Sequence, residues 1–387
     1  MAISLKERFR FNKLSNLLFV GVITSIGVSL LNGVWALYFY SFFKSNSLVG
    51  FFSSILSVIA LLSFFIFNPL IEKYQENKIY FYSVFFSILI LILLVINKSF
   101  YLLVILVIAY VMFSVLRADT FGIMYRDESK TKALGKNEGL VYSLSNVGWI
   151  IGALLLTPLL KVYDLKDMFL FAAIFTTIAL IIFIFYKRKI RKPNYVKIDL
   201  IKNIKDFFAN KELYRLYLSS LGTSFWIGFI FVYIPLYIVQ NGFSRSFVGV
   251  FLFIFLLPYL TEYFVGKKSD VIGSKIFITL GYLIVGIFTI LAYFANQINL
   301  VLLFLVLGSF GVAMTSPTRE IYFFKTIKRL EEERYYGIFL THVEVSLLLG
   351  KIIPAILLIF TGFKTVFLIM GLIMFVFFIF SLKLKNI

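Results

Sequence analysis

Twelve apolar stretches fill this chain, and each is long enough to cross a lipid bilayer as an α-helix. The hydrocarbon core of a bilayer is about 30 Å thick, which takes about 20 apolar residues per helix. Of the 387 residues, 61% are hydrophobic and 15% are charged, whereas soluble domains contain about 45–50% apolar and about 25% charged residues. No water-soluble fold of this size could hide so much apolar surface. We therefore expect an all-α membrane protein with twelve transmembrane helices.

The spans fall into two groups of six, separated by one long basic segment. We place them at 16–43, 48–70, 79–96, 100–122, 138–160, 167–186, 214–239, 246–266, 276–295, 299–322, 335–360 and 364–382. The pattern predicts an N-terminal six-helix bundle (1–186), a cytoplasmic basic linker (187–212) and a C-terminal six-helix bundle (213–387). In the linker, Ile201, Ile204 and Phe208 recur at helical spacing among lysines. This spacing fits an amphipathic helix on the membrane surface and equally a solvated tether.

The charge of the chain predicts its topology. The net charge of +19 comes from 38 Lys and Arg residues, most of which lie in the termini, the linker and the loops on the same side. Excess Lys and Arg mark the cytoplasmic side of a membrane protein. We therefore expect a multi-pass protein of the plasma membrane with both termini in the cytoplasm, in which the basic residues do not indicate a nucleic-acid partner.

Short motifs recur in the two halves. Residues 47–50 before the second span correspond to 246–249 before the eighth, and Gly152 in the fifth span corresponds to Gly350 in the eleventh. Repeats about 200 residues apart are typical of secondary transporters, which bind their solute near mid-membrane where the repeats meet.

Ionisable residues inside the spans are informative, because a charge at the bilayer centre costs at least about 2.5–3.5 kcal/mol. Spans 3, 6, 9 and 12 have none in their apolar cores, which predicts that these helices face lipid. The residues found in other spans are Arg117, Asp119, Glu262, Arg319, Glu320, His342, Glu344 and Lys351. The first five lie near cytoplasmic ends. Four of them either form ion pairs that close the inner mouth of a pathway or contact a substrate directly, whereas Glu262 has either a structural or a coupling role.

The eleventh span carries the strongest candidates for substrate binding and coupling. Glu344 and Lys351 fall on one stripe of a helix, about 10 Å apart along its axis. A substrate or water could bridge them. Lipid disfavours the charged form of a carboxylate, so Glu344 can take up and release protons, as a coupled carrier requires. The alternative is a structural pair with another helix.

Other polar and aromatic residues lie at similar depths. His342, the only histidine, serves either as a proton relay or as a hydrogen-bonded core residue. The remaining candidates for contact with an amphipathic organic solute are Asn146, Asn32, Trp35 and Trp226. Each also fits simple helix packing. With one histidine and no cysteine, we expect no metal site, no cofactor and no enzymatic activity.

The loop after the eighth span contains Gly266, Asp270, Gly273 and then Lys275. This order resembles the loop signature of the major facilitator superfamily. The corresponding N-terminal loop matches the signature only in part: it has a carboxylate at Glu72 but lacks both glycines. The resemblance implies cytoplasmic charge clusters that stabilise the outward-facing state, with Glu72 beside Arg117 and Asp270 beside Arg319.

Glycines in the fifth span give a second, partial resemblance. Gly139, Gly148 and Gly152 have the spacing of the superfamily's antiporter signature, but Ala153 stands where that signature has proline. The match favours export by proton exchange. Small residues also let helices approach closely without any such role.

These resemblances imply a secondary transporter in which two six-helix bundles expose a central site alternately to each side. The expected activity is proton-coupled efflux of a hydrophobic or amphipathic small molecule by a monomer. The alternatives are proton-coupled uptake of a sugar or other metabolite, coupling to sodium, and a carrier-like receptor without transport.

The absence of native cysteine makes the topology testable by labelling. A single cysteine in the linker 187–212 should stay unlabelled when intact cells meet a membrane-impermeant maleimide. A single cysteine at Asn241, in the loop after the seventh span, should be labelled. Labelling of the linker position in intact cells would contradict the topology.

Overall fold

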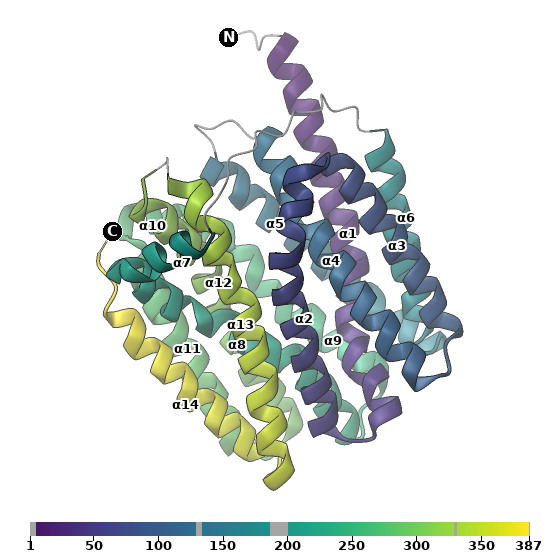
Figure 1. Ribbon diagram of the computed structural model, residues 1–387. Coiled ribbons are helices and arrows are strands. Elements are labelled where there is room, and N and C mark those ends of the chain that lie inside the picture. The colour runs from purple at the N-terminus through teal and green to yellow at the C-terminus, as the bar shows by residue number, and fades with distance from the viewer. Residues whose placement is uncertain (1–4, 129–133, 186–199, 329–330, 387) are drawn as a thin grey trace. The chain divides into compact units, whose positions relative to one another are not determined.

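The computed structural model describes residues 5–128, 134–185, 200–328 and 331–386 (Figure 1). Within these residues every regular element is a helix. Twelve segments are long and apolar enough to cross a membrane, which confirms the predicted fold class and the predicted number of spans. A helix suits lipid because it satisfies its backbone hydrogen bonds within one segment.

The N-terminal half contains α1 (Leu5–Phe43), α2 (Asn46–Lys73), α3 (Glu76–Ile96), α4 (Phe100–Glu128), α5 (Leu134–Val162) and α6 (Asp167–Ile184). The C-terminal half contains α7 (Leu200–Ala209), α8 (Lys211–Gln240), α9 (Arg245–Leu256), the 3-10 helix η2 (Leu257–Thr261), α10 (Glu262–Ile272), α11 (Ser274–Phe294), α12 (Ile298–Thr326), α13 (Glu332–Phe360) and α14 (Phe363–Leu382). Several helices run past the predicted spans, because hydropathy detects only the apolar part of a helix.

The eighth span is broken, which the sequence analysis did not predict. Three helices, α9, η2 and α10, together cover Arg245–Ile272. Pro258 lies in the first turn of η2. Proline has no N–H group, so it is tolerated in a first turn, where that group would have no partner within the helix. The Thr261 hydroxyl donates to the Pro258 carbonyl at 2.6 Å.

Gly266 and Asp270 were placed in the loop after the eighth span, but both lie within α10, because the helix continues to Ile272. Only Gly273 makes the turn to α11, with φ of 100°, a conformation that glycine adopts without strain. Lys275 lies in the first turn of α11.

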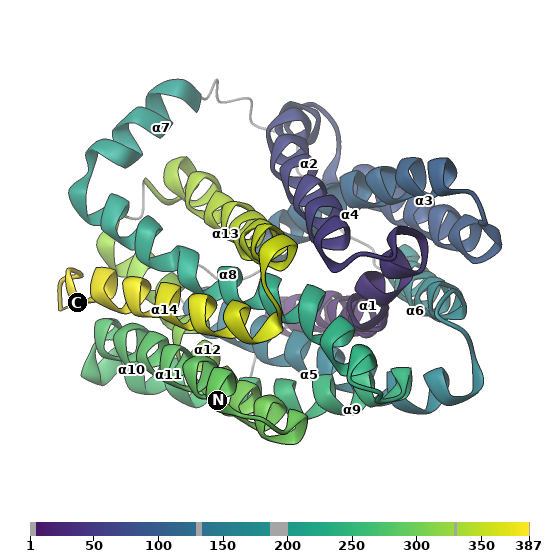
Figure 2. The ribbon, with the colours of Figure 1, turned by 90° about the horizontal axis from the view of Figure 1, so that it is seen from below.

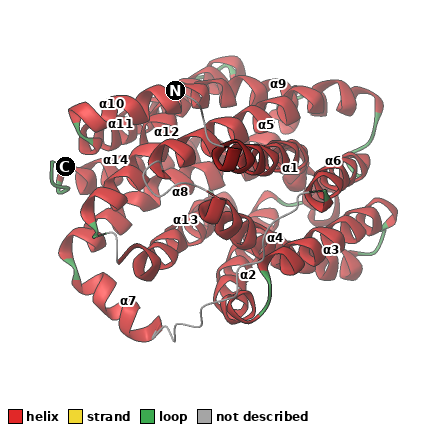
Figure 3. Ribbon diagram, turned by 90° about the horizontal axis from the view of Figure 1, so that it is seen from above, coloured by secondary structure: helices red, strands yellow, loops and turns green. Residues whose placement is uncertain are grey.

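The chain packs as two compact units. The first comprises Met1–Tyr38 and Ile59–Val196, and the second comprises Phe39–Val58 and Lys197–Ile387. The segment 39–58 therefore belongs to the first bundle by sequence but packs with the second compact unit. In the first unit α3 packs against α4 and α6. In the second, α11 lies beside α12 and α14 (Figure 2, Figure 3).

Helix α8 is the central element of the second unit. It contacts α7, α9, α12, α13 and α14, and most of its side chains are buried. By contrast, α3, α6, α11 and α14 expose apolar side chains, among them Leu89, Ile174, Leu280 and Leu372. These are the helices that the sequence predicted to face lipid.

Helix α7 covers the described part of the linker, whereas residues 187–199 lie outside the described residues. It buries Asn203 and Phe207 and leaves Ile201 and Phe208 exposed. The Arg334 side chain of α13 donates to Asn203 Oδ1 at 2.5 Å and also pairs with Asp206. These contacts hold α7 against the second unit.

A glycine lets α13 approach α8 closely. A Cβ atom added to Gly350 would lie 1.9 Å from the Phe225 carbonyl oxygen of α8. The obstructing atom is backbone, so it cannot swing aside as a flexible side chain could. Gly228 of α8 in turn lies against the backbone of Leu347.

We therefore expect Gly350→Ala to destabilise the protein by about 1–3 kcal/mol, the usual cost of overpacking. The matched control is Gly122→Ala in α4, where an added Cβ would meet nothing within 4 Å. Thermal unfolding in detergent should show a lower midpoint for Gly350→Ala alone. Equal midpoints for the two variants would contradict the close α8–α13 contact.

Candidate functional site

Helix α13 carries two oppositely charged side chains on one face. Glu344 and Lys351 are both half-buried and interact electrostatically with each other. Their backbone positions are about 10 Å apart along the helix axis, since α-helices rise 1.5 Å per residue. Neither side chain forms an ion pair within the described part of the chain.

Within the described residues, the Lys351 ammonium forms one hydrogen bond, to a residue of α2. Its Nζ donates to the Ser57 hydroxyl at 2.7 Å. Ser57 is buried and belongs to the second unit with α13. The Tyr233 hydroxyl of α8 donates to the Lys351 backbone carbonyl at 2.5 Å. Lys351 is therefore positioned by two other helices, and among the described residues Ser57 is the one hydrogen-bond partner of its ammonium group.

The segment 39–58 has further contacts with α8 and α13. The side-chain amides of Asn46 and Gln240 exchange two hydrogen bonds, at 3.1 and 2.7 Å. A Cβ atom added to Gly50 would lie 1.8 Å from the Tyr233 hydroxyl. The sequence analysis did not predict the Asn46–Gln240 contact, because no local pattern relates residues that are far apart in the chain. The recurring motif at residues 47–50 singled out Gly50 but not its partner Tyr233.

His342 lies in a different environment from Glu344. It is buried, and two residues along a helix place side chains on nearly opposite faces. Arg319 donates through Nη1 to His342 Nε2 at 2.7 Å and to the Ser220 carbonyl at 3.0 Å. His342 Nδ1 lies 2.5 Å from the Phe339 carbonyl. Because Nε2 accepts from Arg319, Nδ1 carries the proton and the ring is neutral.

Arg319 and His342 therefore form a buried cluster inside the second unit, apart from the Glu344 face. Glu320 and Glu262 are buried as well, and Tyr259 lies within electrostatic range of both Glu262 and Arg319. This arrangement gives His342 a hydrogen-bonding role in the core, which was one of the two interpretations left open by the sequence.

The loop signature forms a different ion pair from the one that the resemblance implied. Asp270 is exposed and meets Lys325 at 3.4 Å, whereas Arg319 contacts His342. Lys325 is six residues beyond Arg319 on α12, or about 9 Å further along the axis, which places it level with Asp270 near the end of α10.

The N-terminal members of the predicted clusters lie in the first unit. Arg117 is buried in α4 and lies within electrostatic range of Tyr80. Asp119 is half-buried one half-turn further along the same helix. Glu72 lies in α2, but its side chain is outside the described residues.

The aromatic and amide candidates are divided between the two units. Trp226 is fully buried, donates to the Thr289 hydroxyl at 3.0 Å and stacks on Phe255. In the first unit, Trp35 packs on Phe169, and Asn32 donates to its own helix at the Val28 carbonyl. Asn146 is half-buried in α5.

The glycines of the fifth span have a packing role. An added Cβ would lie 2.5 Å from the Val22 carbonyl at Gly148 and 2.5 Å from the Ser29 Cβ at Gly152. Both glycines therefore let α5 approach α1. Gly139 lies in α5, where its surroundings are outside the described residues. An antiporter role for these residues stays a prediction.

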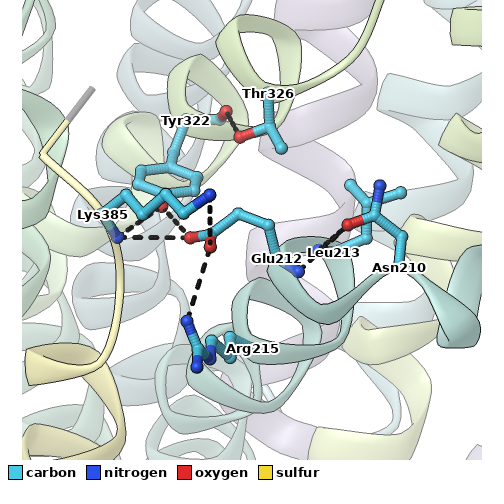
Figure 4. Close-up of polar contacts among 7 residues, drawn as sticks. All are labelled: Asn210, Glu212, Leu213, Arg215, Tyr322, Thr326 and Lys385. Carbon is cyan, nitrogen blue, oxygen red and sulfur yellow. Dashed lines mark hydrogen bonds and ion pairs between the residues drawn. The ribbon is translucent and has the colours of Figure 1, made fainter.

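A polar cluster joins the start of α8 to α12 and to the C-terminal segment (Figure 4). Asn210 caps α8 by accepting from the Glu212 and Leu213 amides at 3.0 and 3.4 Å. The buried Glu212 carboxylate accepts from the Tyr322 hydroxyl and from the Lys385 amide. Lys385 Nζ and Arg215 lie 3.9 and 3.7 Å from its other oxygen. The sequence analysis assigned Glu212 to the linker and missed this cluster.

Comparison with known proteins identifies the family. The family model described as Major Facilitator Superfamily matches residues 17–261 and 240–386. An uncharacterized MFS-type transporter of Methanocaldococcus jannaschii is 31% identical over 202 residues, or 47% of each chain. The staphylopine export protein of Staphylococcus aureus is 24% identical over 184 residues, or 46% of each chain. The matched segment thus spans about half the length of these relatives.

Solved structures show the same fold. The nucleoside transporter NupG aligns with a TM-score of 0.75 at 13% identity, covering 97% of this chain and 100% of that chain. A POT family transporter in complex with 5-aminolevulinic acid aligns with a TM-score of 0.78 at 13% identity, covering 95% of each chain. Together with the twelve spans, the family match establishes that this chain belongs to the Major Facilitator Superfamily.

Proposed function

We propose that this protein is a secondary active transporter that exports a small organic solute in exchange for protons. The observation that carries the proposal is the pair of opposite charges on α13, Glu344 and Lys351. Both lie in a membrane-spanning segment, both are half-buried, and neither forms an ion pair among the described residues. Charges in this situation mark substrate or ion pathways in membrane proteins.

Glu344 is the proposed coupling group. A carboxylate shielded from bulk water is readily neutralised by a proton, and Lys351 lies on the same face of α13. Binding of a proton and binding of a solute at this face therefore affect each other. Alternating access then exposes the face to one side of the membrane at a time.

Two observations support export as the direction of transport. A relative at 24% identity is named an export protein, and the spacing of Gly139, Gly148 and Gly152 resembles an antiporter signature. Export of an amphipathic solute is therefore preferred over proton-coupled uptake of a metabolite. A carrier-like receptor would bind its ligand without flux.

The proposed setting is the plasma membrane, with both termini in the cytoplasm, and the proposed transporting unit is a monomer. In this orientation the Asp270–Lys325 pair and the cluster around Glu212 lie at cytoplasmic ends of helices. Protons are the proposed coupling ion, and sodium is the alternative.

Glu344→Gln should abolish flux driven by a pH gradient, by more than about tenfold, because an amide cannot exchange a proton in this range. Flux is measured in proteoliposomes over a panel of organic solutes, with simultaneous proton readout and with a sodium gradient as a separate arm. The control is Glu331→Gln, the same change at the N-cap of α13. Proton coupling that is unchanged in Glu344→Gln would remove Glu344 from the mechanism. Flux that follows only the sodium gradient would show that protons are not the coupling ion.

Asp270→Asn should favour the inward-facing state, because the pair with Lys325 is proposed to stabilise the closed inner mouth. An exposed ion pair contributes at most about 1 kcal/mol, so the populations should shift by less than about fivefold. Spin labels at Tyr74→Cys and Lys267→Cys, both exposed positions, report the opening as longer distances. Lys325→Met should give the same shift, and the double variant should shift the populations no further than either single variant. Unchanged distances in all three variants would contradict the role of the pair.

A further inference from the structure

We infer that the Glu344–Lys351 face binds a zwitterionic solute, with the solute's carboxylate at Lys351 and its ammonium group at Glu344. This inference rests on the proposed transport function and names the class of its substrate. The sequence analysis favoured a hydrophobic or amphipathic solute without specifying its charges.

The Lys351 end has free hydrogen-bonding capacity for an anion. A lysine ammonium has three N–H donors, and within the described residues one of them is used, by the Ser57 hydroxyl at 2.7 Å. The Tyr233 hydroxyl bonds the Lys351 backbone and not its ammonium group. Charge-assisted hydrogen bonds to a carboxylate are about twice as strong as neutral ones, so a carboxylate is a better additional partner than a hydroxyl or an amide.

The Glu344 end has the complementary capacity. Among the described residues, its carboxylate forms no hydrogen bond or ion pair, and its strongest charge neighbour is Lys351. A carboxylate accepts through two oxygens and donates nothing when ionised. An ammonium group supplies the donors and the positive charge that this end lacks.

The spacing of the two ends requires one molecule that carries both charges. Along the helix the two positions are about 10 Å apart, too far for the side chains to satisfy each other fully. Leu348 lies between them on the same stripe. A solute with a short apolar segment between its ammonium and carboxylate groups would contact all three side chains. A solute with one charge would leave the other protein charge without an ionic partner and would forgo one charge-assisted interaction.

Binding can be measured with simple probes on the purified full-length protein. The probes are the linear ω-amino acids from aminobutyrate to aminooctanoate, each compared with the alkylamine and the carboxylic acid of the same length. A ligand that binds only the folded state stabilises it by RT ln(1 + L/Kd), where L is the free ligand concentration, so thermal shifts at graded concentrations give relative affinities. We expect the best ω-amino acid to bind about 10- to 100-fold more tightly than either single-charge analogue.

Two variants assign the two ends. In Lys351→Met, the ω-amino acid and the alkylamine should bind equally, because the carboxylate has lost its partner. In Glu344→Gln, the ω-amino acid and the carboxylic acid should bind equally. The matched control is Lys364→Met. Lys364 donates to Asn296 at an exposed site, so this substitution should leave the selectivity intact. A wild-type protein that does not prefer the zwitterion, or a preference that survives both substitutions, overturns the inference.

The outcome is separable from that of the transport assay. Proton-coupled flux of an uncharged solute that is unaffected by Lys351→Met would keep the proposed transport and overturn the zwitterion site. Selective binding of ω-amino acids without any flux of them would keep the site and overturn the proposed transport.

Discussion

An ionisable side chain inside a membrane-spanning helix must be compensated, because lipid offers it neither water nor an opposite charge. Helix α13 carries two such side chains, Glu344 and Lys351, on the same face. Insertion scales put the cost of each charge at the bilayer centre at about 2.5–3.5 kcal/mol. The described protein supplies Lys351 with one hydroxyl, from Ser57. The two side chains also attract each other, and we attribute the remaining compensation to water or a bound solute, which links the fold to the proposed transport.

The other face of α13 shows what full compensation by protein looks like. His342 is buried with Arg319, and both ring nitrogens have partners. Gly350 is packed against the α8 backbone. The helical repeat thus separates one helix into a packed face, which anchors α13 to α8, and a polar face, which carries Glu344 and Lys351 and is the proposed ligand site. A rigid anchor of this kind holds the polar face in a defined position.

Much of the fold followed from the sequence, because hydropathy is a property of local composition. All twelve spans and the helical class were predicted, and the exposed apolar faces of α3, α6, α11 and α14 match the absence of charge in those spans. The break at Pro258 was not predicted, although the proline was a visible signal. Helix ends were misplaced wherever polar residues continue the helix, as in α4 and α10.

The site was only partly predictable. Helical periodicity placed Glu344 and Lys351 on one face, because that depends on neighbours along one helix. It could not identify Ser57, which is 294 residues from Lys351. The family resemblance implied that Asp270 lies beside Arg319. In the structure Asp270 pairs with Lys325, because these two residues lie at the same height near the ends of α10 and α12. Partners across helices depend on packing that no local pattern encodes.

The central claim is that the face of α13 between Glu344 and Lys351 is reached by water and solutes within the membrane. Its most direct test is the reactivity of Leu348→Cys toward a small, charged, membrane-impermeant thiosulfonate in proteoliposomes, with the buried Leu305→Cys of α12 as the unreactive reference. The account predicts that Leu348→Cys reacts and that a bound ω-amino acid slows the reaction. A Leu348→Cys protein as unreactive as Leu305→Cys would mean that this face is sealed, which would contradict the account.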